Sequence, residues 1–386
     1  MVSTTDIQLN NGTFFGLGHP MLDISTQVSL EFLERYNLQA NNVVLAGSLS
    51  NYDELSNEIL NKGNYKLNYS PGGSTLNTLK TIKWFLEQDN LTTYMGCIGQ
   101  DEHGKKLQQQ QMNNCLYQIN SDLPTATCLI LITDQARSMI TNLAAANEFT
   151  IDYLNQSDNW LYVERAKIFY VSGYFIRTCS QAVLKLAQHA EKKRKIFAFN
   201  LSAEYICEKF GKEIMKLLPL VDFLFGNEQE AKCFAQHHLN IDTNTDIAHI
   251  AEELQKKLSK NTDTCVIITR GADPIVLASK NGVKMFTVKR PPKIIDTVGC
   301  GDAFAGGFLA YWSLNTSIDD CINAACYCAY ECLLQTECFL AYWSLNTSID
   351  DCINAACYCA YECLLQTECQ FTNPSSFNPT KRYCNV

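Results

Sequence analysis

A glycine-broken turn that runs directly into an apolar helix is the stretch of this chain best suited to chemistry. Residues 296–304 read Asp-Thr-Val-Gly-Cys-Gly-Asp-Ala-Phe, and an apolar run follows them. Gly299 and Gly301 remove two side chains, so backbone N–H groups can converge there on a small anion at the helix N-terminus. Asp302 stands on the first helical turn and can accept the proton of an attacking hydroxyl. These two properties suit phosphoryl transfer.

A purely structural interpretation of the same residues stays open at this point. Gly299 can form a tight turn before a buried helix, and Asp302 can be a first-turn carboxylate stabilised by the helix dipole. A short glycine motif by itself does not decide between the two interpretations.

A second glycine turn and an early carboxylate are further candidates for a ligand site. Residues 71–74 (Pro-Gly-Gly-Ser) lead into a predicted helix at 75–88, and Asn77 lies one turn into it. Asp23 follows the predicted first strand, where a carboxylate can accept two hydrogen bonds from a vicinal diol. The structural alternatives are a helix cap for Ser74 and a solvated turn for Asp23.

Short β-rich runs and helical runs alternate from Ala166 onward. The β-rich runs are residues 167–171, 196–200, 223–226 and 265–269, and the helical runs between them are 181–193, 205–218, 229–236 and 247–259. This alternation predicts an α/β fold with a mostly parallel sheet flanked by helices. Ligand sites in such folds lie beyond the carboxyl ends of the strands. The residues that fall at such ends are Gly18, Asn200, Asn227, Thr269, Arg270 and Gly271.

Several segments together resemble the ribokinase-like (carbohydrate and purine kinase) family, and in particular its adenosine kinases. Besides the turn at 296–304, they are residues 16–25, 71–77, 96–99, 137–147 and 225–231, in the family's order and at its spacing. The similarity covers roughly residues 12–338 and the tail after Cys369. It implies a ribokinase-like fold with a small β lid, and ATP-dependent phosphorylation of the adenosine 5′-hydroxyl to give AMP and ADP.

The resemblance assigns roles to individual residues. Asp302 is implied to be the catalytic base, and the backbone of Gly299, Cys300 and Gly301 the anion hole. The residues implied to bind the nucleoside are His19, Asp23, Gly73, Ser74, Asn77 and Phe175. Those implied to bind ATP are Asn200, Asn227, Thr269 and Gly271.

Two charged residues are implied to act on the phosphates. Arg137, on a predicted hairpin of residues 127–133 and 138–142, would reach them from the lid, although an exposed hairpin arginine is ordinarily just solvated. Glu230, with Asn227 on one face of a helix start, would hold Mg²⁺ through water. The alternative for Glu230 is a glutamate stabilised by the helix dipole, which suits Glu228 better. A monovalent cation is a further candidate cofactor beside Mg²⁺ and the co-substrate ATP.

The resemblance further implies two domains. Residues 1–20, 71–120 and 146–386 would form the large nucleotide-binding domain, and residues 21–70 and 121–145 the small lid domain. Two positions depart from the family pattern. His19 replaces the usual asparagine, which could alter ribose contacts or their pH dependence. Cys300 replaces the usual alanine, which is tolerable because the donor there is backbone.

A segment near the end of the chain occurs twice in tandem with an identical sequence. Residues 308–338 recur without change at 339–369. The family needs this segment once, so we treat 339–369 as an extra copy and expect the first copy to occupy its place.

Composition excludes several classes of protein. The chain has 386 residues, with 46% apolar residues, 18% charged residues and a net charge of −9. We therefore expect a globular protein that does not bind nucleic acid or membranes non-specifically. We find no signal peptide and expect a monomer in the cytoplasm, with the nucleus as an alternative. The 19 cysteines are expected to be mostly buried thiols. Alternatives to adenosine phosphorylation are a kinase for another nucleoside or sugar, and a catalytically inactive nucleoside-binding protein.

Overall fold

Two β-sheets organise the chain in a computed structural model. It describes residues 9–39, 43–109, 114–133, 136–258, 263–292, 294, 297–334 and 384–385. The large sheet has the strand order β15-β14-β13-β12-β11-β10-β9-β1-β5-β6. Its strands are β1 (Phe14–Leu17), β5 (Thr92–Gly99), β6 (Cys115–Asn120), β9 (Ile168–Ser172), β10 (Ile196–Asn200), β11 (Phe223–Asn227), β12 (Cys265–Arg270), β13 (Asp273–Ser279), β14 (Gly282–Val288) and β15 (Cys384–Asn385).

The strands from β12 to β6 run parallel to one another, and β13, β14 and β15 continue the sheet antiparallel. The prediction of a mostly parallel sheet is therefore confirmed. The four β-rich runs after Ala166 are the strands β9, β10, β11 and β12.

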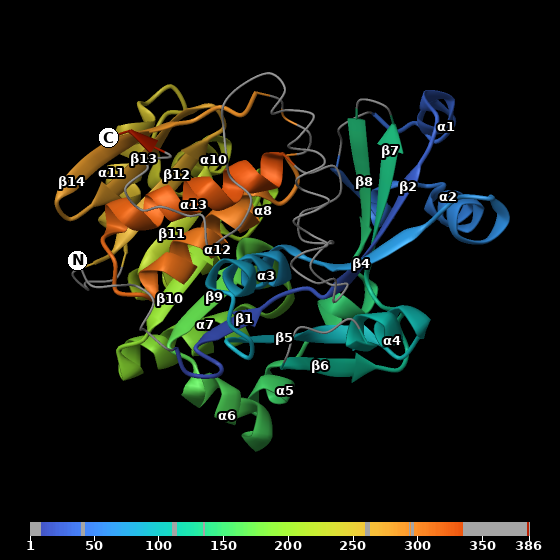
Figure 1. The fold of residues 1–386 in the computed structure, drawn as a ribbon, viewed down its shortest axis with the longest axis horizontal. Helices are drawn as coiled ribbons and strands as arrows, with labels where there is room; N and C mark the ends of the chain where they lie inside the picture. Colours follow the sequence, from blue (N-terminus) through green and yellow to red (C-terminus); the bar gives the residue numbers. More distant parts are fainter. Residues whose placement is uncertain are drawn as a thin grey trace.

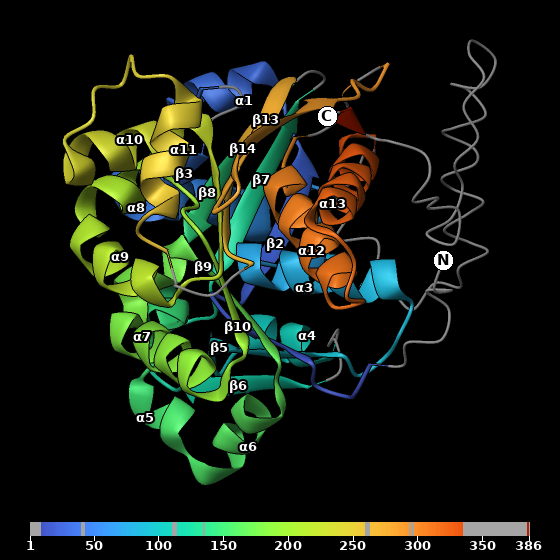
Figure 2. The same ribbon diagram turned by 90° about the vertical axis from the view of Figure 1, so that its left-hand side faces the viewer.

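Helices cover both faces of the large sheet, as Figure 2 shows. One face carries α7 (Ile176–Lys193), α8 (Glu204–Lys209), α9 (Gly211–Leu217), α10 (Glu228–Leu239) and α11 (Ile247–Gln255). The other face carries α3 (Ser74–Leu86), α12 (Cys300–Trp312) and α13 (Ile318–Leu333). Successive strand residues point to opposite faces, so Phe14 joins the core beneath α3 and α12, while Phe15 joins the core beneath α7.

The second sheet has five strands in the order β3-β8-β7-β2-β4 and projects from one side of the large sheet (Figure 1). Its strands are β2 (Met21–Gln27), β3 (Val43–Leu45), β4 (Asn68–Gly72), β7 (Thr127–Thr133) and β8 (Ala136–Asn142). The remaining helices are α1 (Leu30–Arg35), α2 (Tyr52–Asn57), α4 (Glu102–Gln109), α5 (Ile151–Asn155) and α6 (Ser157–Arg165). The exact boundaries of the two domains remain a prediction.

The prediction of one helix was wrong. The helix predicted at 205–218 is two helices, α8 and α9, which break at Phe210. Gly211, the first residue of α9, lies so close to the His238 ring of α10 that an added Cβ would come within 1.9 Å of it. Eleven cysteines of the described part are free thiols, but Cys326 is disulfide-bonded. No helix of the described ranges is long and apolar enough to cross a bilayer.

The first copy of the repeat lies in the core as far as Leu334. It forms the end of α12 and all of α13, and the two helices pack closely against each other. A Cβ on Gly307 would come within 2.6 Å of Cys328 Sγ, and Ala325 is fully buried. Residues 335–338 and the whole second copy, 339–369, lie outside the described residues.

We predict that matched substitutions in the two copies have different effects. Ala325→Asp places a carboxylate in a closely packed interface, so it should lower the free energy of unfolding by more than about 4 kcal/mol or prevent folding. Ala356→Asp and deletion of residues 339–369 should leave thermal unfolding nearly unchanged. Loss of folding with Ala356→Asp alone would show that the second copy carries the structural role.

Candidate active site

The predicted anion-binding turn forms the start of α12. Gly299 precedes the helix as its N-cap with φ +80°, a left-handed conformation that favours glycine. A Cβ on Gly301 would meet no atom of the described residues within 4 Å, so among these residues the turn is open. The N–H of Cys300 donates to the Thr297 carbonyl at 3.3 Å, which is long for this bond type. The turn thus has room for a small anion beside the positive end of a 13-residue helix.

Asp302 receives hydrogen bonds from two residues of the second glycine turn and its helix. The Ser74 hydroxyl donates to Asp302 Oδ1 at 2.6 Å, and the Asn77 amide donates to Oδ2 at 3.2 Å. The structure therefore joins two turns that lie far apart in the sequence, and it orients the carboxylate through both of its oxygens.

Ser74 does not cap α3, so that structural alternative is wrong. Gly73 is the N-cap, with φ +110°, and an added Cβ there would come within 2.2 Å of the His19 carbonyl oxygen. A glycine is required at that position for both reasons. The helix starts at Ser74, whose hydroxyl is left to bind Asp302.

Burial makes Asp302 a stronger base than an exposed aspartate. Its surroundings raise the pKa of the carboxyl to about 6, while the hydrogen bonds from Ser74 and Asn77 act in the opposite direction. The group is therefore mostly ionised at neutral pH, as predicted for a helix N-terminus, yet it accepts a proton more readily than the sequence suggested.

Asp23 lies on β2 with its carboxylate against the Gly72 backbone. A Cβ on Gly72 would come within 2.1 Å of Asp23 Oδ2, so only glycine leaves room for the carboxylate. Burial raises the pKa of Asp23 to about 7; the charge of Lys80 lowers it and that of Asp302 raises it. Asp23 is a strand residue, not a solvated turn residue.

His19 is buried and packs 5.1 Å from the Phe175 ring, measured between ring centroids. Its Nε2 lies 2.7 Å from the Thr178 hydroxyl, which donates to Asn147 Oδ1. Because that hydroxyl has one proton, His19 Nε2 carries the donor hydrogen and Nδ1 is an acceptor. Burial and the charge of Arg177 lower the pKa of His19 to about 3, so this departure from the family pattern adds no titration near neutral pH.

The residues predicted to bind ATP do lie at the carboxyl ends of adjacent strands. Asn200 ends β10, Asn227 ends β11, and Thr269 lies near the end of β12. Gly271 follows β12 in a turn with φ +61°. Asn200 donates to the Tyr170 hydroxyl at 3.4 Å, and Thr269 donates to the Gly226 carbonyl at 3.4 Å.

Asn227 and Glu230 form a capping box at the start of α10. The Asn227 side chain accepts from the Glu230 N–H at 2.8 Å, and the two Glu230 oxygens accept from the backbone and side chain of Asn227. Burial raises the pKa of Glu230 to about 7, with further contributions from Glu204 and Asp302. Glu228, which also lies in the first turn of α10, instead forms ion pairs with Arg270 and Lys232.

Arg137 lies on the second sheet. It is the second residue of strand β8, where it pairs with Ile132 of β7. It therefore belongs to a different sheet from the strand ends near Asp302.

Two buried polar atoms near the site lack a hydrogen-bond partner within the described part of the chain. They are Asn77 Oδ1 and the Tyr94 hydroxyl, and the latter lies beneath the glycine turns, close to Gly18 and Gly73. A buried acceptor without a partner is costly. Asn77 Oδ1 is thus available for a donor on a ligand.

Two further residues lie beside the site, although the motifs of the sequence do not include them. Tyr170 of β9 lies close to Ser74 and Asp302, and the buried Lys80 lies near Asp23. Lys80 could have been found from spacing, because it is three residues after Asn77 on the same helix face. Tyr170 carries no such signal, since it is one of several aromatic residues in β strands.

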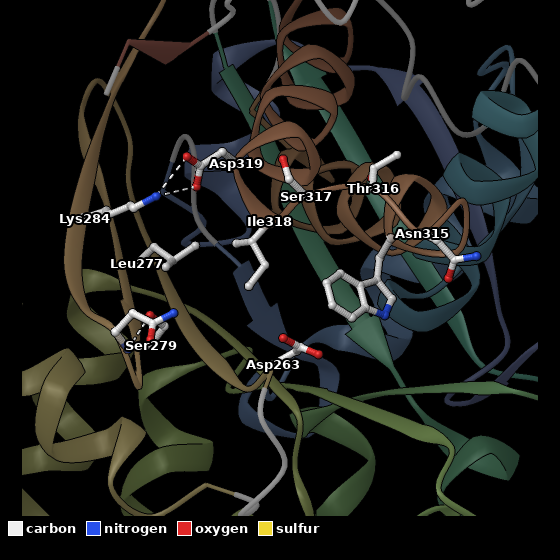
Figure 3. A pocket seen from close by; sticks show the side chains of 11 residues that line it. Asp263, Leu277, Ser279, Lys284, Asn315, Thr316, Ser317, Ile318 and Asp319 are labelled. Carbon is white, nitrogen blue, oxygen red and sulfur yellow. Dashed lines mark hydrogen bonds and ion pairs between the residues drawn. The ribbon is translucent and has the colours of Figure 1, made fainter. Parts of the chain in front are cut away.

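A surface cavity elsewhere on the large sheet is not part of this site. It lies between the β13–β14 hairpin and the start of α13, beside the Lys284–Asp319 ion pair (Figure 3). Asp263, which precedes β12, and Ser279, which pairs with Cys265, both line it. The cavity is therefore at the amino end of β12, opposite the strand ends where ligands bind in such folds.

Comparisons with known proteins agree with this geometry. Residues 40–339 match the model of the pfkB family carbohydrate kinases. Adenosine kinase 2 of Arabidopsis thaliana is 37% identical over 85% of this chain and 95% of its own length. Adenosine kinase of Dictyostelium discoideum is 34% identical over 82% of this chain and 93% of its own length.

Solved structures show the same fold. Anopheles gambiae adenosine kinase, in complex with P1,P4-di(adenosine-5) tetraphosphate, superposes with a TM-score of 0.76 at 34% identity, over 86% of this chain and 98% of that one. Schistosoma mansoni adenosine kinase with 2-fluoroadenosine gives 0.76 at 32% identity, over 85% and 97%. The predicted ribokinase-like fold is confirmed, and the chain belongs to the pfkB carbohydrate kinase family, in the group that includes the proteins named adenosine kinase.

Proposed function

We propose that this protein phosphorylates adenosine at its 5′-hydroxyl with ATP, giving AMP and ADP. The observation that carries the proposal is the position of Asp302, a buried carboxylate at an open glycine turn, oriented by Ser74 and Asn77. The relatives that match over most of the chain are adenosine kinases, which favours adenosine over another nucleoside or a sugar.

Nucleoside binding is assigned to the residues around the second glycine turn. Asp23 would accept the two hydroxyls of the ribose diol, and Asn77 Oδ1 would accept a further ligand hydroxyl, since it has no other partner in the described part of the chain. His19, Gly73, Ser74 and Phe175 complete this part of the proposed site. The acceptor Nδ1 of His19 can bind a hydroxyl of the ligand where the family's asparagine would.

The chemical step depends on Asp302 and the turn before it. Asp302 would accept the 5′-hydroxyl proton while the oxygen forms a bond to the γ-phosphorus and the bond to the ADP oxygen breaks. The backbone N–H groups of Gly299, Cys300 and Gly301 would stabilise the developing negative charge. A late proton transfer, which a loose transition state allows, suits a base with a pKa near 6.

ATP would be bound along the strand ends by Asn200, Asn227, Thr269 and Gly271, with Arg137 contributing from the second sheet. Glu230 fits a magnesium-bound nucleotide for two reasons. Its carboxylate is a hard oxygen donor, which Mg²⁺ prefers, and its negative charge is destabilised by Asp302, so a nearby cation would stabilise it. The described residues contain no cluster of three or more His, Cys, Asp or Glu able to hold a metal by themselves. Glu230 would hold Mg²⁺ through a water molecule, and the bound ion would supply positive charge against the phosphates.

A monomeric cytoplasmic enzyme is part of this proposal, supported by the net charge of −9 and by the globular composition. Light scattering after size-exclusion chromatography tests the first point and cell fractionation tests the second. Measuring AMP formation from adenosine, and phosphorylation of inosine, ribose and fructose, tests the substrate. Absence of ATP-dependent product formation from adenosine would favour an inactive nucleoside-binding protein.

Replacing the proposed base should reduce turnover without abolishing binding. Asp302→Asn should lower kcat by about 10²- to 10⁴-fold, the usual contribution of a positioned base. Adenosine affinity, measured by calorimetry, should change far less. Near-normal turnover of Asp302→Asn would contradict the assignment.

Removal of one hydrogen bond to Asp302 should change the pH profile. Asp302 and Asp23 have raised pKa values of about 6 and 7, so activity should fall as the pH drops through this range and the two carboxyls become protonated. The Ser74 hydrogen bond stabilises the ionised form of Asp302. Ser74→Ala should therefore move the acid limb of kcat to higher pH, by about one unit. A limb that stays in place would argue against Asp302 as the titrating base.

Neighbouring glutamates of α10 provide a matched test of the magnesium assignment. Glu230→Gln should require a higher Mg²⁺ concentration for half-maximal activity. Glu228→Gln, which disrupts only surface ion pairs with Arg270 and Lys232, should not. If the two variants give the same Mg²⁺ titration as the unmodified protein, Glu230 serves only in its capping box.

A further inference from the structure

Lys80 is a buried lysine that has no part in the mechanism above. It lies on α3, on the face that carries Ser74 and Asn77, and only 4% of its surface is exposed. Its ammonium group donates a hydrogen bond to the carbonyl of Pro71. Burying an ammonium group is costly unless anionic or polar partners surround it. The identity of those partners therefore indicates what the lysine does.

The carbonyl that binds Lys80 belongs to the peptide that supports Asp23. Pro71 and Gly72 end β4, which pairs with β2, the strand of Asp23. The Asp23 carboxylate lies directly against Gly72, since an added Cβ there would come within 2.1 Å of Oδ2. The ammonium group and the carboxylate are thus held against one short piece of backbone, the Pro71–Gly72 peptide.

The charges in this region explain why a cation is needed there. Asp23 is influenced by the negative charge of Asp302, which raises its pKa, as burial does. The charge of Lys80 acts in the opposite direction and lowers the pKa of Asp23. With Lys80 in place the pKa of Asp23 is about 7, so loss of this cation would raise the pKa further and favour the protonated carboxyl at neutral pH. A protonated Asp23 would have one acceptor fewer for a diol.

We propose that Lys80 is a positioning residue for the ribose, which favours the diol-accepting form of Asp23 and fixes the Pro71–Gly72 peptide beneath it. This inference rests on the proposed function, because it takes Asp23 as the residue that binds the ribose diol. Lys80 touches neither the substrate nor the reacting atoms in this account. Its effect on the ligand passes through Asp23 and should depend on the hydroxyls that Asp23 binds.

Ligands with and without the diol distinguish this role from a purely structural one. Binding of adenosine and of 2′,3′-dideoxyadenosine to the full chain is measured by calorimetry without ATP. The unmodified protein should prefer adenosine, and Lys80→Met should reduce that preference by about 10-fold or more, mainly through weaker adenosine binding. Lys80→Arg retains the charge and should keep part of the preference.

Lys83 provides the matched control on the same helix. It pairs with Asp89 at 3.0 Å on the surface, so Lys83→Met should leave the preference unchanged. Circular dichroism verifies that each variant is folded. An unchanged preference in folded Lys80→Met overturns the inference, and so does loss of folding in both Lys80 variants, because Lys80 would then serve the fold itself. If the unmodified protein does not bind adenosine, the proposed function fails first, and the inference fails with it.

Discussion

The two hydrogen bonds from α3 to Asp302 determine the arrangement of the whole site. They join residues 228 and 225 positions apart in the chain, and they exist only because α12 packs very close to α3. Gly306 of α12 makes the close packing of the two helices possible, since a Cβ at this position would come within 2.6 Å of Thr81 Cβ in α3. A larger residue would push the helices apart and move the carboxylate away from its donors. The catalytic geometry therefore depends on close packing in the core.

Three acidic groups lie at this site: Asp302 itself, Asp23 and Glu230. Their negative charges destabilise one another. Asp302 raises the pKa values of Asp23 and Glu230, and burial raises all three. A carboxyl whose pKa is raised by folding stabilises the folded state when protonated, and that contribution is lost as the pH rises through about 6 to 7. At neutral pH the site thus costs stability, which a diol and a magnesium-bound nucleotide would restore on binding. Lys80 reduces this loss of stability at Asp23 whether or not a ligand is bound, because its positive charge stabilises the ionised carboxylate.

The sequence predicted the parallel sheet and the residues of both glycine turns, because spacing of glycine, carboxylate and apolar residues is a local property. It did not predict the use made of Ser74. Its hydroxyl serves Asp302 because Gly73 adopts a positive φ and caps the helix itself, and neither the φ nor the distant partner is visible locally. Lys80 was missed for a related reason, since a lysine within a helix ordinarily reaches solvent. The close approach of Gly211 in α9 to His238 in α10 is likewise a tertiary contact that local spacing does not reveal.

The position of the repeat explains how an added segment can leave this arrangement intact. Every residue assigned to the site precedes Ala303, so chain inserted after Cys338 changes no spacing among them. The first copy continues α12 without interruption, and Gly307 and Ala325 allow α13 to pack directly against it. Helix α12 is thereby held from both sides, by α3 and by α13, before the second copy begins. For that reason the stability of the α12–α13 contact, more than the length of the chain after it, should decide whether the site remains assembled.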